Sequence, residues 1–424
     1  MPIVELSGSN FKSFTDFKID LGRLNIFVGP NASGKSNLIQ VFSFLRGISA
    51  FGLKSSINGH GGPKYISNLR SDSDETSISL RGFQPTSPQL ILGQDPSETV
   101  SWNKNPGFDS EYHFRIKIDG TSGKVQVLED SLKLKFLSKV PIGQRRLLVP
   151  PPPLTKPDIL VSHGKGKLLA EAPASASIPP SLRSLRSFME MMETIPVPDN
   201  MLLLESPLAA PFIQMALFDL LNASFFSIEP ARVKQPTKTM GPPVLDSSGS
   251  NLAFVLNAFL QNKSSHDRLL ALVRDLMPYV SDVRSEQAFD NLLLHVAEGF
   301  SREEFLPAPL MSDGTVTALA LIVALYFENK PFLLVEEPER NLHPKVLSRM
   351  VSMMHDVSKQ RQLLITTHSS EVVKWADVSD LILMTRDSNG NSVMTRPASN
   401  DAVRSFLKEE VSLDELHVQN LLGP

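Results

Sequence analysis

The sequence predicts an α/β fold with an antiparallel β lobe, a mixed α/β lobe and a proline-rich, partly helical insertion. Three observations predict it. Residues 77–136 alternate apolar and polar side chains with a period of two, as half-buried strands do. After Leu310 helical and strand patterns take turns, which is typical of a parallel sheet with crossover helices. Near the N-terminus, a glycine-containing loop follows an apolar strand and precedes an amphipathic helix.

The N-terminal lobe is predicted to span residues 1–136. Its first part contains three strand patterns, Ile3–Leu6, Phe17–Ile19 and Leu24–Val28, and the last of these is apolar enough for a buried strand. A broad apolar helical face follows the loop. The turn residues Asp119-Gly120 and Ser122-Gly123 separate two alternating segments, so we expect a small antiparallel sheet here.

Residues 137–245 differ in composition from both flanking regions. Prolines are frequent, with four in a row at Pro150–Pro153, and such a run favours polyproline II and cannot continue a helix. Helical patterns at Leu182–Met192 and Phe212–Leu221 interrupt the extended stretches. We interpret this region as an insertion.

The C-terminal lobe is predicted to span residues 246–424. Helical periodicity returns over residues 251–277, and regular alternation begins after Leu310. The expected elements are a helix from about Thr315, a strand Phe332–Val335, a helix from about Pro344, and strands Gln362–Thr366 and Leu381–Met384.

Composition excludes several classes of protein. The net charge of −3 argues against a uniformly basic protein that coats nucleic acid, so any such contact would need a local patch. The chain has no cysteine, which excludes disulfides, cysteine-ligated metals and thiol catalysis and fits a cytoplasmic protein. We see no signal-peptide pattern and no apolar run near the roughly 20 residues that span a bilayer. We therefore expect a soluble protein with no membrane partner.

The loop Gly29–Ser36 matches G-x-x-x-x-G-K-[ST] at every fixed position. Its glycines let the backbone wrap a triphosphate, with successive N–H groups pointing inward at the positive end of a helix. Lys35 is expected to reach the β- and γ-phosphates, and the Ser36 hydroxyl to ligate Mg²⁺. The sequence thus predicts ATP and Mg²⁺ as ligands. The predicted nucleotide-binding residues of this segment are Gly29, Asn31, Ser33, Gly34, Lys35, Ser36 and Asn37.

The strand pattern Phe332–Val335 ends in two carboxylates, Glu336 and Glu337. In P-loop enzymes a neighbouring strand delivers one acid to the magnesium shell, which we assign to Glu336, although aspartate is usual there. Glu337 is the candidate general base. Without the P-loop, an acidic strand end would simply indicate exposure to solvent.

Two further segments each have a structural and a functional interpretation. His368 ends an apolar strand; a lone histidine there is usually structural, but its order after the acidic strand favours a switch that senses the γ-phosphate. Ser312 or Asp313 can cap the following helix. Alternatively, that helix start and the Ser312 hydroxyl bind the γ-phosphate held by a second subunit, and the order of motifs favours this function.

The order of NFKSF, GPNASGKSN, SDGT, EEPERNLHP and TTHSS resembles the RecF/SMC/OLD-like group of ABC ATPases, especially its stand-alone AAA_21 members. The resemblance is close over residues 1–45 and 308–385. It implies an ABC-type P-loop NTPase fold and a head-to-tail dimer with two ATP molecules between opposite subunits. Ser312 and Gly314 would act in trans, and Asn341–His343 would occupy the D-loop position.

Two departures from the family pattern bear on the hydrolysis rate. Glu336 replaces the usual aspartate, and Gln84 is only a weak candidate for the Q-loop glutamine. Our leading hypothesis is an ATPase whose ATP-gated dimer controls a separate nuclease or toxin effector, by analogy in anti-phage defence.

The alternatives are a RecF-like DNA-repair clamp and a non-hydrolysing ATP-binding scaffold. A modestly basic stretch between Arg145 and Arg186 would serve the clamp. However, no aromatic residues separate its charges in the way that single-stranded DNA binding favours, so a solvated face explains it as well.

Overall fold

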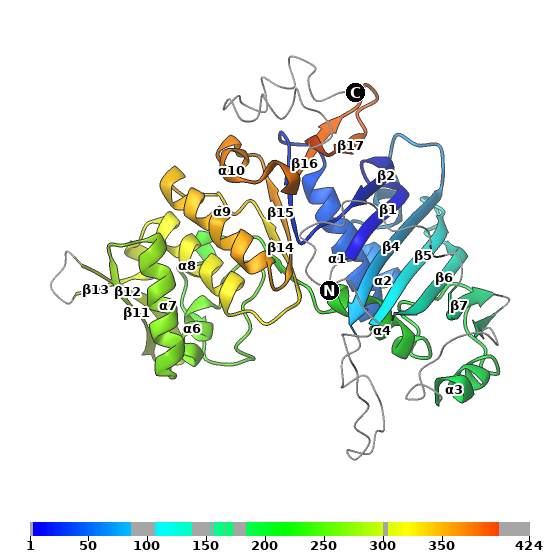
Figure 1. Ribbon diagram of the computed structural model, residues 1–424, viewed down its shortest axis with the longest axis horizontal. Coiled ribbons are helices and arrows are strands. Elements are labelled where there is room, and N and C mark those ends of the chain that lie inside the picture. Colours follow the sequence, from blue (N-terminus) through cyan, green and yellow to red (C-terminus); the bar gives the residue numbers. More distant parts are fainter. Residues whose placement is uncertain are drawn as a thin grey trace.

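The computed structural model describes residues 3–85, 107–137, 154, 157–164, 166–172, 184–299 and 304–397. Two large sheets organise these residues, and a smaller sheet lies at one end of the molecule (Figure 1). The predicted α/β fold with an antiparallel and a mixed lobe is confirmed. Pro150–Pro153 and most of the basic stretch between Arg145 and Arg186 lie outside the described residues.

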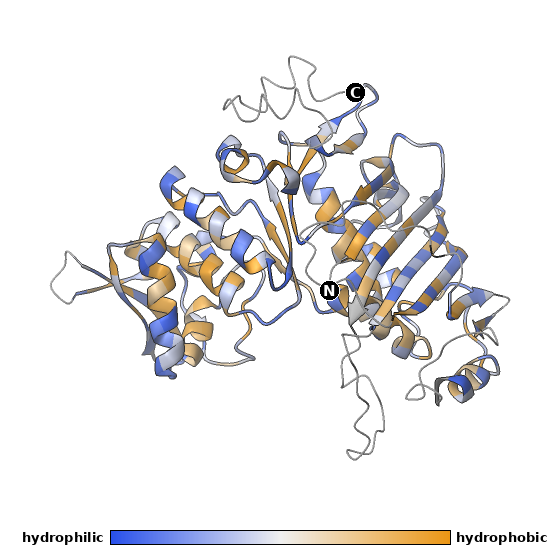
Figure 2. Ribbon diagram, viewed as in Figure 1, coloured by the Kyte–Doolittle hydropathy of each residue, from blue (hydrophilic) through white to orange (hydrophobic). Residues whose placement is uncertain are grey.

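The first large sheet is antiparallel, with the strand order β2-β1-β4-β5-β6-β7-β8. Hydropathy alternates along its strands, so one face joins the core (Figure 2). The predicted turn after β5 is confirmed, because the Asp119 carboxylate accepts hydrogen bonds from the backbone N–H groups of Thr121 and Ser122. The strands are β1 (Ile3–Phe11), β2 (Phe14–Asp20), β4 (Glu75–Pro85), β5 (Gly107–Ile118), β6 (Val125–Leu137), β7 (Ile159–Gly164) and β8 (Lys167–Glu171).

The second large sheet has the order β17-β16-β3-β15-β14-β9 and is parallel except for β17. Elements cover both of its faces, which explains why β3 and β15 are buried at every position. The predictions for β3, β14, β15 and β16 are confirmed to within about two residues. The strands are β3 (Leu24–Val28), β9 (Ser224–Phe226), β14 (Phe332–Glu336), β15 (Gln362–Thr367), β16 (Leu381–Arg386) and β17 (Ser392–Thr395).

Two separate cores lie on the two faces of this parallel sheet, because successive side chains of a strand point to opposite sides. Leu334 and Leu364 pack with α1, α4 and the antiparallel sheet. Leu333 and Leu363 pack with α6, α7, α8 and α9. Helices α1 and α8 therefore lie on opposite faces of one sheet. The helices are α1 (Lys35–Phe51), α2 (Leu53–Gly59), α4 (Ala210–Leu221), α6 (Leu252–Leu260), α7 (Lys263–Leu276), α8 (Asp313–Tyr326) and α9 (Pro344–Ser358).

The small sheet is made of β10, which precedes α6, and of β11 to β13, which follow α7, and it was not predicted from the sequence. Its strands pair in the order β10-β12-β11, with β13 also pairing with β12. The remaining elements are β10 (Thr237–Lys238), β11 (Val280–Ala288), β12 (Asn291–Glu298), β13 (Phe305–Pro307), α3 (Ser184–Met192), α5 (Pro230–Val233) and α10 (Ser370–Trp375), with short 3₁₀ helices Pro63–Tyr65, Ala308–Leu310 and Val378–Asp380.

The segment 137–245 contributes to more than one part of the fold. Its strands β7 and β8 extend the antiparallel sheet, and β9 pairs with β14 at the edge of the parallel sheet. The domain divisions at residues 137 and 246 stay a prediction. None of the helices in the described ranges combines the length and apolar character needed to cross a bilayer.

Candidate functional site

The loop between β3 and α1 has a shape that depends on two glycines. Gly34 has φ 110°, which side chains rarely tolerate, and a Cβ atom there would clash with the Ser392 hydroxyl. A Cβ atom on Gly29 would clash with the Met384 carbonyl. No side-chain hydrogen bond caps the start of α1. The first N–H groups of α1 therefore suit an anion held in the loop.

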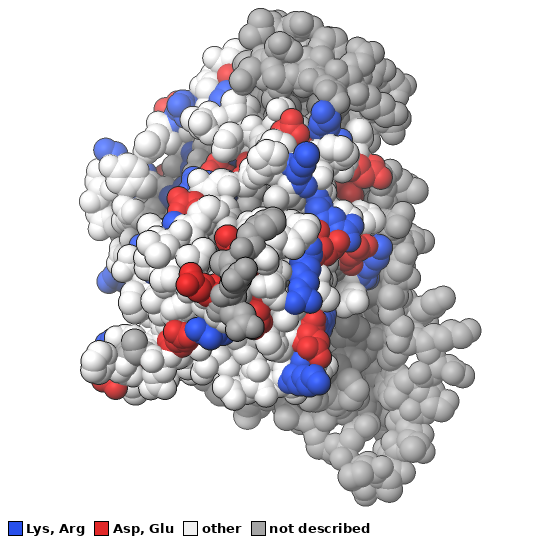
Figure 3. All heavy atoms as spheres, turned by 90° about the vertical axis from the view of Figure 1, so that its left-hand side faces the viewer, with Lys and Arg blue, Asp and Glu red and all other residues white. Residues whose placement is uncertain are grey.

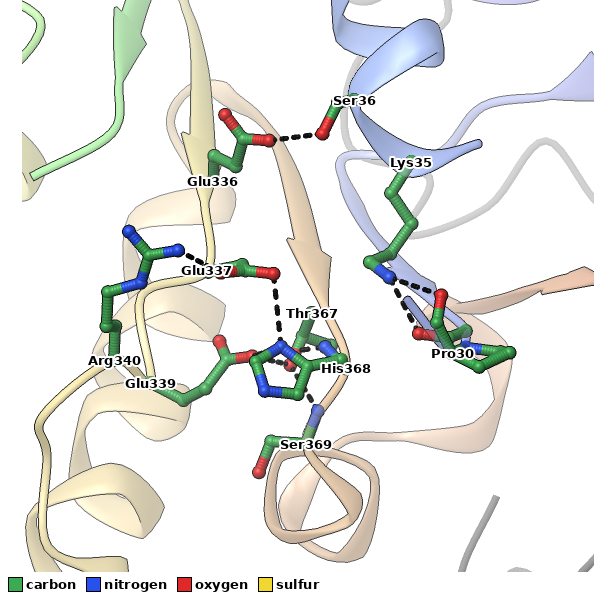
Figure 4. Close-up of polar contacts among 11 residues, drawn as sticks. Pro30, Lys35, Ser36, Glu336, Glu337, Glu339, Arg340, Thr367, His368 and Ser369 are labelled. Atoms are coloured by element: carbon green, nitrogen blue, oxygen red, sulfur yellow. Dashed lines mark hydrogen bonds and ion pairs between the residues drawn. The ribbon is translucent and has the colours of Figure 1, made fainter. Parts of the chain in front are cut away.

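Lys35 is the first residue of α1 and is only 6% exposed. Its ammonium folds back onto the loop and donates to the carbonyl oxygens of Gly29 at 2.7 Å and Pro30 at 2.8 Å (Figure 4). Burial lowers the pKa of Lys35, and nearby carboxylates, Glu337 foremost, act in the opposite direction. A phosphate in the loop would likewise favour the charged ammonium.

Two side chains that sequence reasoning did not single out hold this loop from outside. Ser392, in β17, donates from its hydroxyl to the Ser33 carbonyl at 2.6 Å. Arg386, at the end of β16, donates from Nε to the Ala32 carbonyl at 2.8 Å. A serine and an arginine more than 350 positions away from the loop belong to no motif, so only the fold reveals them.

The other predicted residues of the loop have different surroundings. Asn31 is exposed. Ser33 is 1% exposed, and its hydroxyl has no hydrogen-bond partner among the described residues. Asn37 donates from Nδ2 to the Ser13 hydroxyl at 2.7 Å, in the turn between β1 and β2. Asn31 is thus free to meet a ligand, whereas Asn37 already supports the turn.

Ser36 and Glu336, the predicted metal ligands, are in direct contact. The Ser36 hydroxyl donates to Glu336 Oε1 at 2.7 Å, although the residues are 300 positions apart (Figure 4). A hydroxyl and a carboxylate are the hard oxygen donors that Mg²⁺ prefers, so this pair fits the ion. Across the described residues, no group of three or more His, Asp or Glu forms a metal site alone.

Glu337 and His368, the predicted base and switch, also lie together. Glu337 has φ 46°, an uncommon conformation for a residue other than glycine, of the kind that gathers at functional sites. Its Oε1 lies 3.1 Å from His368 Nδ1, and its Oε2 accepts a hydrogen bond from Arg340 at 2.7 Å. Both carboxylate oxygens are therefore engaged in this state.

A third acid, Glu339, belongs to the motif EEPERNLHP but received no role from the sequence. Its side chain is buried, and Oε1 accepts hydrogen bonds from the Thr367 hydroxyl at 2.5 Å and the His368 backbone N–H at 3.1 Å. Its position two residues after Glu337, inside the motif, is the sequence signal that could have identified Glu339 as part of the site.

Ser312 and Gly314 lie at the start of α8, apart from the residues above. The Ser312 hydroxyl accepts a hydrogen bond from the Thr315 N–H at 3.1 Å, which confirms the helix-cap interpretation, and the residue is exposed. A Cβ atom on Gly314 would lie 2.7 Å from the Asn341 carbonyl. The predicted signature therefore packs against the predicted D-loop.

An open groove of about 720 Å³ runs beside Glu337 and His368. Glu337, His368, Asn31 and Asn341 all line it, so it connects the loop after β3 with the turn after β14. The weak Q-loop candidate Gln84 lies at the end of β4, and its side chain is outside the described set.

The sequence matches one protein family over residues 24–120 and 214–374, which together make up more than half of the chain. The family is AAA_21, described as "AAA domain, putative AbiEii toxin, Type IV TA system". No curated protein matches the sequence.

Solved structures similar to this chain include three SMC head domains. One is the SMC head bound to the C-winged helix domain of ScpA, with 12% identity, a TM-score of 0.48, and 94% of this chain and 99% of that chain covered. The SMC head domain from Thermotoga maritima has 13% identity, a TM-score of 0.41, and coverage of 93% and 99%. The Pyrococcus furiosus SMC head domain with an extended coiled coil, bound to the C-terminal domain of ScpA, has 11% identity, a TM-score of 0.47, and coverage of 96% and 99%.

Proposed function

The chain belongs to the AAA_21 family, as the order of its motifs suggested, and from that premise we propose that it binds and hydrolyses Mg-ATP at sites shared by two copies of the chain. The matched residues include the loop after β3 and the ends of β14 and β15. ATP hydrolysis, the ligands and the dimer are all parts of this proposal.

One observation supports the proposal most directly. At the carboxyl ends of neighbouring parallel strands, Ser36 contacts Glu336 and Glu337 contacts His368, while Lys35 lies at the start of the adjoining helix and bonds to the loop (Figure 4). Ligands of open α/β sheets bind in the crevice outside these strand ends. The arrangement combines a phosphate cradle, two metal ligands and a base, which are the parts that phosphoryl transfer to water requires.

The binding step follows from the loop geometry. The N–H groups at the start of α1 would hold the phosphates, and Lys35 would turn from the carbonyls of Gly29 and Pro30 toward the β- and γ-phosphates. Ser36 and Glu336 would hold Mg²⁺, which when bound neutralises phosphate charge. Ser392 and Arg386 would keep the loop in shape from outside.

The hydrolytic step requires a change at Glu337. A base needs an oxygen lone pair that faces the attacking water, and each oxygen of Glu337 now faces a partner instead, Oε1 His368 and Oε2 Arg340. We propose that nucleotide and a second copy of the chain draw these partners away. His368 would then contact the γ-phosphate, and Glu337 would orient and deprotonate the attacking water.

The second copy would supply Ser312 and Gly314. Ser312 is exposed, and α8 lies on the opposite face of the parallel sheet from α1. A head-to-tail pair would bring the start of one α8 to the phosphates held by the other chain. The positive end of that helix and the Ser312 hydroxyl suit a γ-phosphate.

We further propose that closure of the pair controls a separate effector, a nuclease or toxin, in anti-phage defence. The family description, which names the AbiEii toxin and a type IV TA system, supports this direction. The effector is the part of the proposal that rests on the family rather than on the site.

The two alternatives have less support. Most of the basic stretch on which a DNA clamp depends lies outside the described residues. Among the described residues on the face in Figure 3, basic and acidic side chains are interspersed. A non-hydrolysing scaffold was suggested by Glu336, but its direct contact with Ser36 supports metal binding by the longer side chain.

Phosphate release by the purified chain tests the proposal. We expect release that depends on both Mg²⁺ and ATP and that DNA leaves unchanged. ATP binding without release would favour the scaffold. Stimulation by DNA, with DNA affinity that falls steeply with salt, would favour the clamp.

A further inference from the structure

We propose that Glu339 is a positioning residue that holds His368 where it can meet the γ-phosphate. The inference rests on the proposed ATPase function and assigns a role to an acid that no motif rule covers. Glu339 would touch neither nucleotide nor water and would act through its two neighbours at the end of β15.

The contacts of Glu339 join two loops of the site. It lies on the segment after β14, and its Oε1 accepts hydrogen bonds from the Thr367 hydroxyl at 2.5 Å and the His368 backbone N–H at 3.1 Å (Figure 4). The same oxygen lies 3.5 Å from His368 Nδ1. One carboxylate oxygen thus fixes both the backbone and the ring environment of His368.

Glu339 suits this role better than Glu337 does. The side chain of Glu337 is 17% exposed, faces Arg340 and must release its partners to act on water. The side chain of Glu339 is 7% exposed and bonds to the backbone, which does not rotate away. Hydrogen bonds to a buried carboxylate are short and strong, so they restrict the loop most effectively.

Stability alone does not account for a carboxylate in this place. Glu339 Oε2 is buried and has no hydrogen-bond partner among the described residues. An unsatisfied buried polar atom is a cost to the fold, and well-packed apolar residues often replace buried charges without loss. Such an atom beside an active site calls for an explanation, and the hold on His368 provides one.

The geometry also couples Glu337, the proposed base, to His368, the proposed switch. Glu337, Glu339 and Asn341 lie on one short segment, and Asn341 meets Gly314 at the start of α8. A shift of this segment would therefore move His368 together with Glu337. Glu339 is the link that carries such a shift to the end of β15.

The test is a double-mutant cycle on steady-state turnover. Glu339→Leu removes the acceptor, Glu339→Gln keeps an acceptor oxygen, and His368→Ala removes the residue that Glu339 is proposed to position. Thr367→Val removes one donor and serves if Glu339→Leu does not fold. Glu328→Leu is the matched control, because Glu328 is 7% exposed and lies just beyond the C-terminal end of α8, away from Ser312.

We expect Glu339→Leu to lower kcat about tenfold to a hundredfold, as misplacement of a catalytic group does, with ATP affinity changed less than about threefold. Glu339→Gln should restore most of kcat. Thr367→Val should lower kcat several-fold, and Glu328→Leu should leave it unchanged. In the His368→Ala background, Glu339→Leu and Thr367→Val should each add less than about a twofold loss.

Two results would overturn the inference. If Glu339→Leu and Thr367→Val turn over ATP like the wild type, the contacts have no role in turnover. If their losses multiply with that of His368→Ala, Glu339 acts independently of His368. Absence of turnover in the wild type is a separate outcome that would remove the proposed function and this inference with it.

Discussion

The two halves of the proposed site are built in different ways. The half around Lys35 draws on the ends of β3, β14 and β15, and two pairs of its side chains, Ser36 with Glu336 and Glu337 with His368, are in direct contact. The half around Ser312 is a single helix start whose exposed serine bonds only locally, to Thr315. One half is therefore assembled within the chain, whereas the other is directed outward.

The exposed half is nevertheless rigid. Every residue of α8 from Thr315 to Leu325 is buried, so the helix is fixed in the core while its first two residues, Asp313 and Gly314, reach the surface. A partner would meet a preformed surface rather than order a loop, which lowers the entropic cost of association. The comparison teaches that the start of α8, the proposed signature, is already formed in the single chain and does not need a second copy to fold it.

Lys35→Ala should have the broadest effect, because it acts on the first half of the site and weakens ATP binding, on which every later step depends. The ammonium is the main cation in the loop, so its removal should weaken ATP binding about a hundredfold or more. Nucleotide titration of the isolated chain measures this. Lys54→Ala, which changes an exposed lysine on α2, is the control. Tight ATP binding by Lys35→Ala would contradict the P-loop assignment.

Glu337→Gln should separate chemistry from binding. Loss of the base should lower phosphate release about 10²- to 10⁴-fold, while ATP still binds because the loop and Lys35 are intact. Glu371→Gln, which changes another acid in the lining of the same groove, should leave turnover unchanged. Unchanged turnover in Glu337→Gln would remove Glu337 from the mechanism.

Sequence and structure agree best where a motif coincides with regular elements. The loop Gly29–Ser36 and strands β14 and β15 were predicted because local patterns fix them. The small sheet and strands β7 to β9 were not predicted. Strand β9 pairs with β14 far along the chain, so no local pattern marks it. The pairs β7–β8 and β11–β12 are hairpins of neighbouring strands, and the sequence analysis did not recognise their short patterns. Side chains such as Ser392 and Arg386 acquire a role only through long-range packing, which no local pattern encodes.

Ser312→Ala should impair only the second half of the proposed site, the start of α8. We expect turnover to fall about a hundredfold, as when one donor to the transition state is lost, with ATP binding to the isolated chain unchanged. Loss of the cap should also cost about 1 kcal/mol of stability. Asn262→Ala removes the corresponding cap of α7, so it should lose similar stability but no turnover. Wild-type turnover in Ser312→Ala would contradict the action of Ser312 in trans.

A buried acid outside both halves gives a baseline for pH effects on stability. Burial raises the pKa of Asp130 to about 8, whereas the pKa of an aspartate in the unfolded chain is about 4. The folded state therefore binds this proton more tightly, and the stability that it contributes is lost as pH rises through that window. The side chain of the Asp130→Asn variant does not titrate. Relative to the wild type, the melting temperature of this variant should therefore rise by on the order of a few °C between pH 4 and pH 8.

Thermal unfolding across this pH range measures the effect. A melting-temperature difference that stays constant with pH would show that Asp130 does not titrate in this way. If turnover changes in the same range while Asp130→Asn and the wild type behave alike, the change belongs to the site rather than to the fold.

The mass of Glu337→Gln in solution, measured with ATP and with ADP, tests the shared site most directly. This variant should hold ATP without hydrolysing it, so the predicted result is a mass with ATP twice that with ADP. Ser312→Arg, introduced into the same variant, should prevent the increase. A mass that is the same with both nucleotides, although ATP is bound, would contradict a site completed by a second copy.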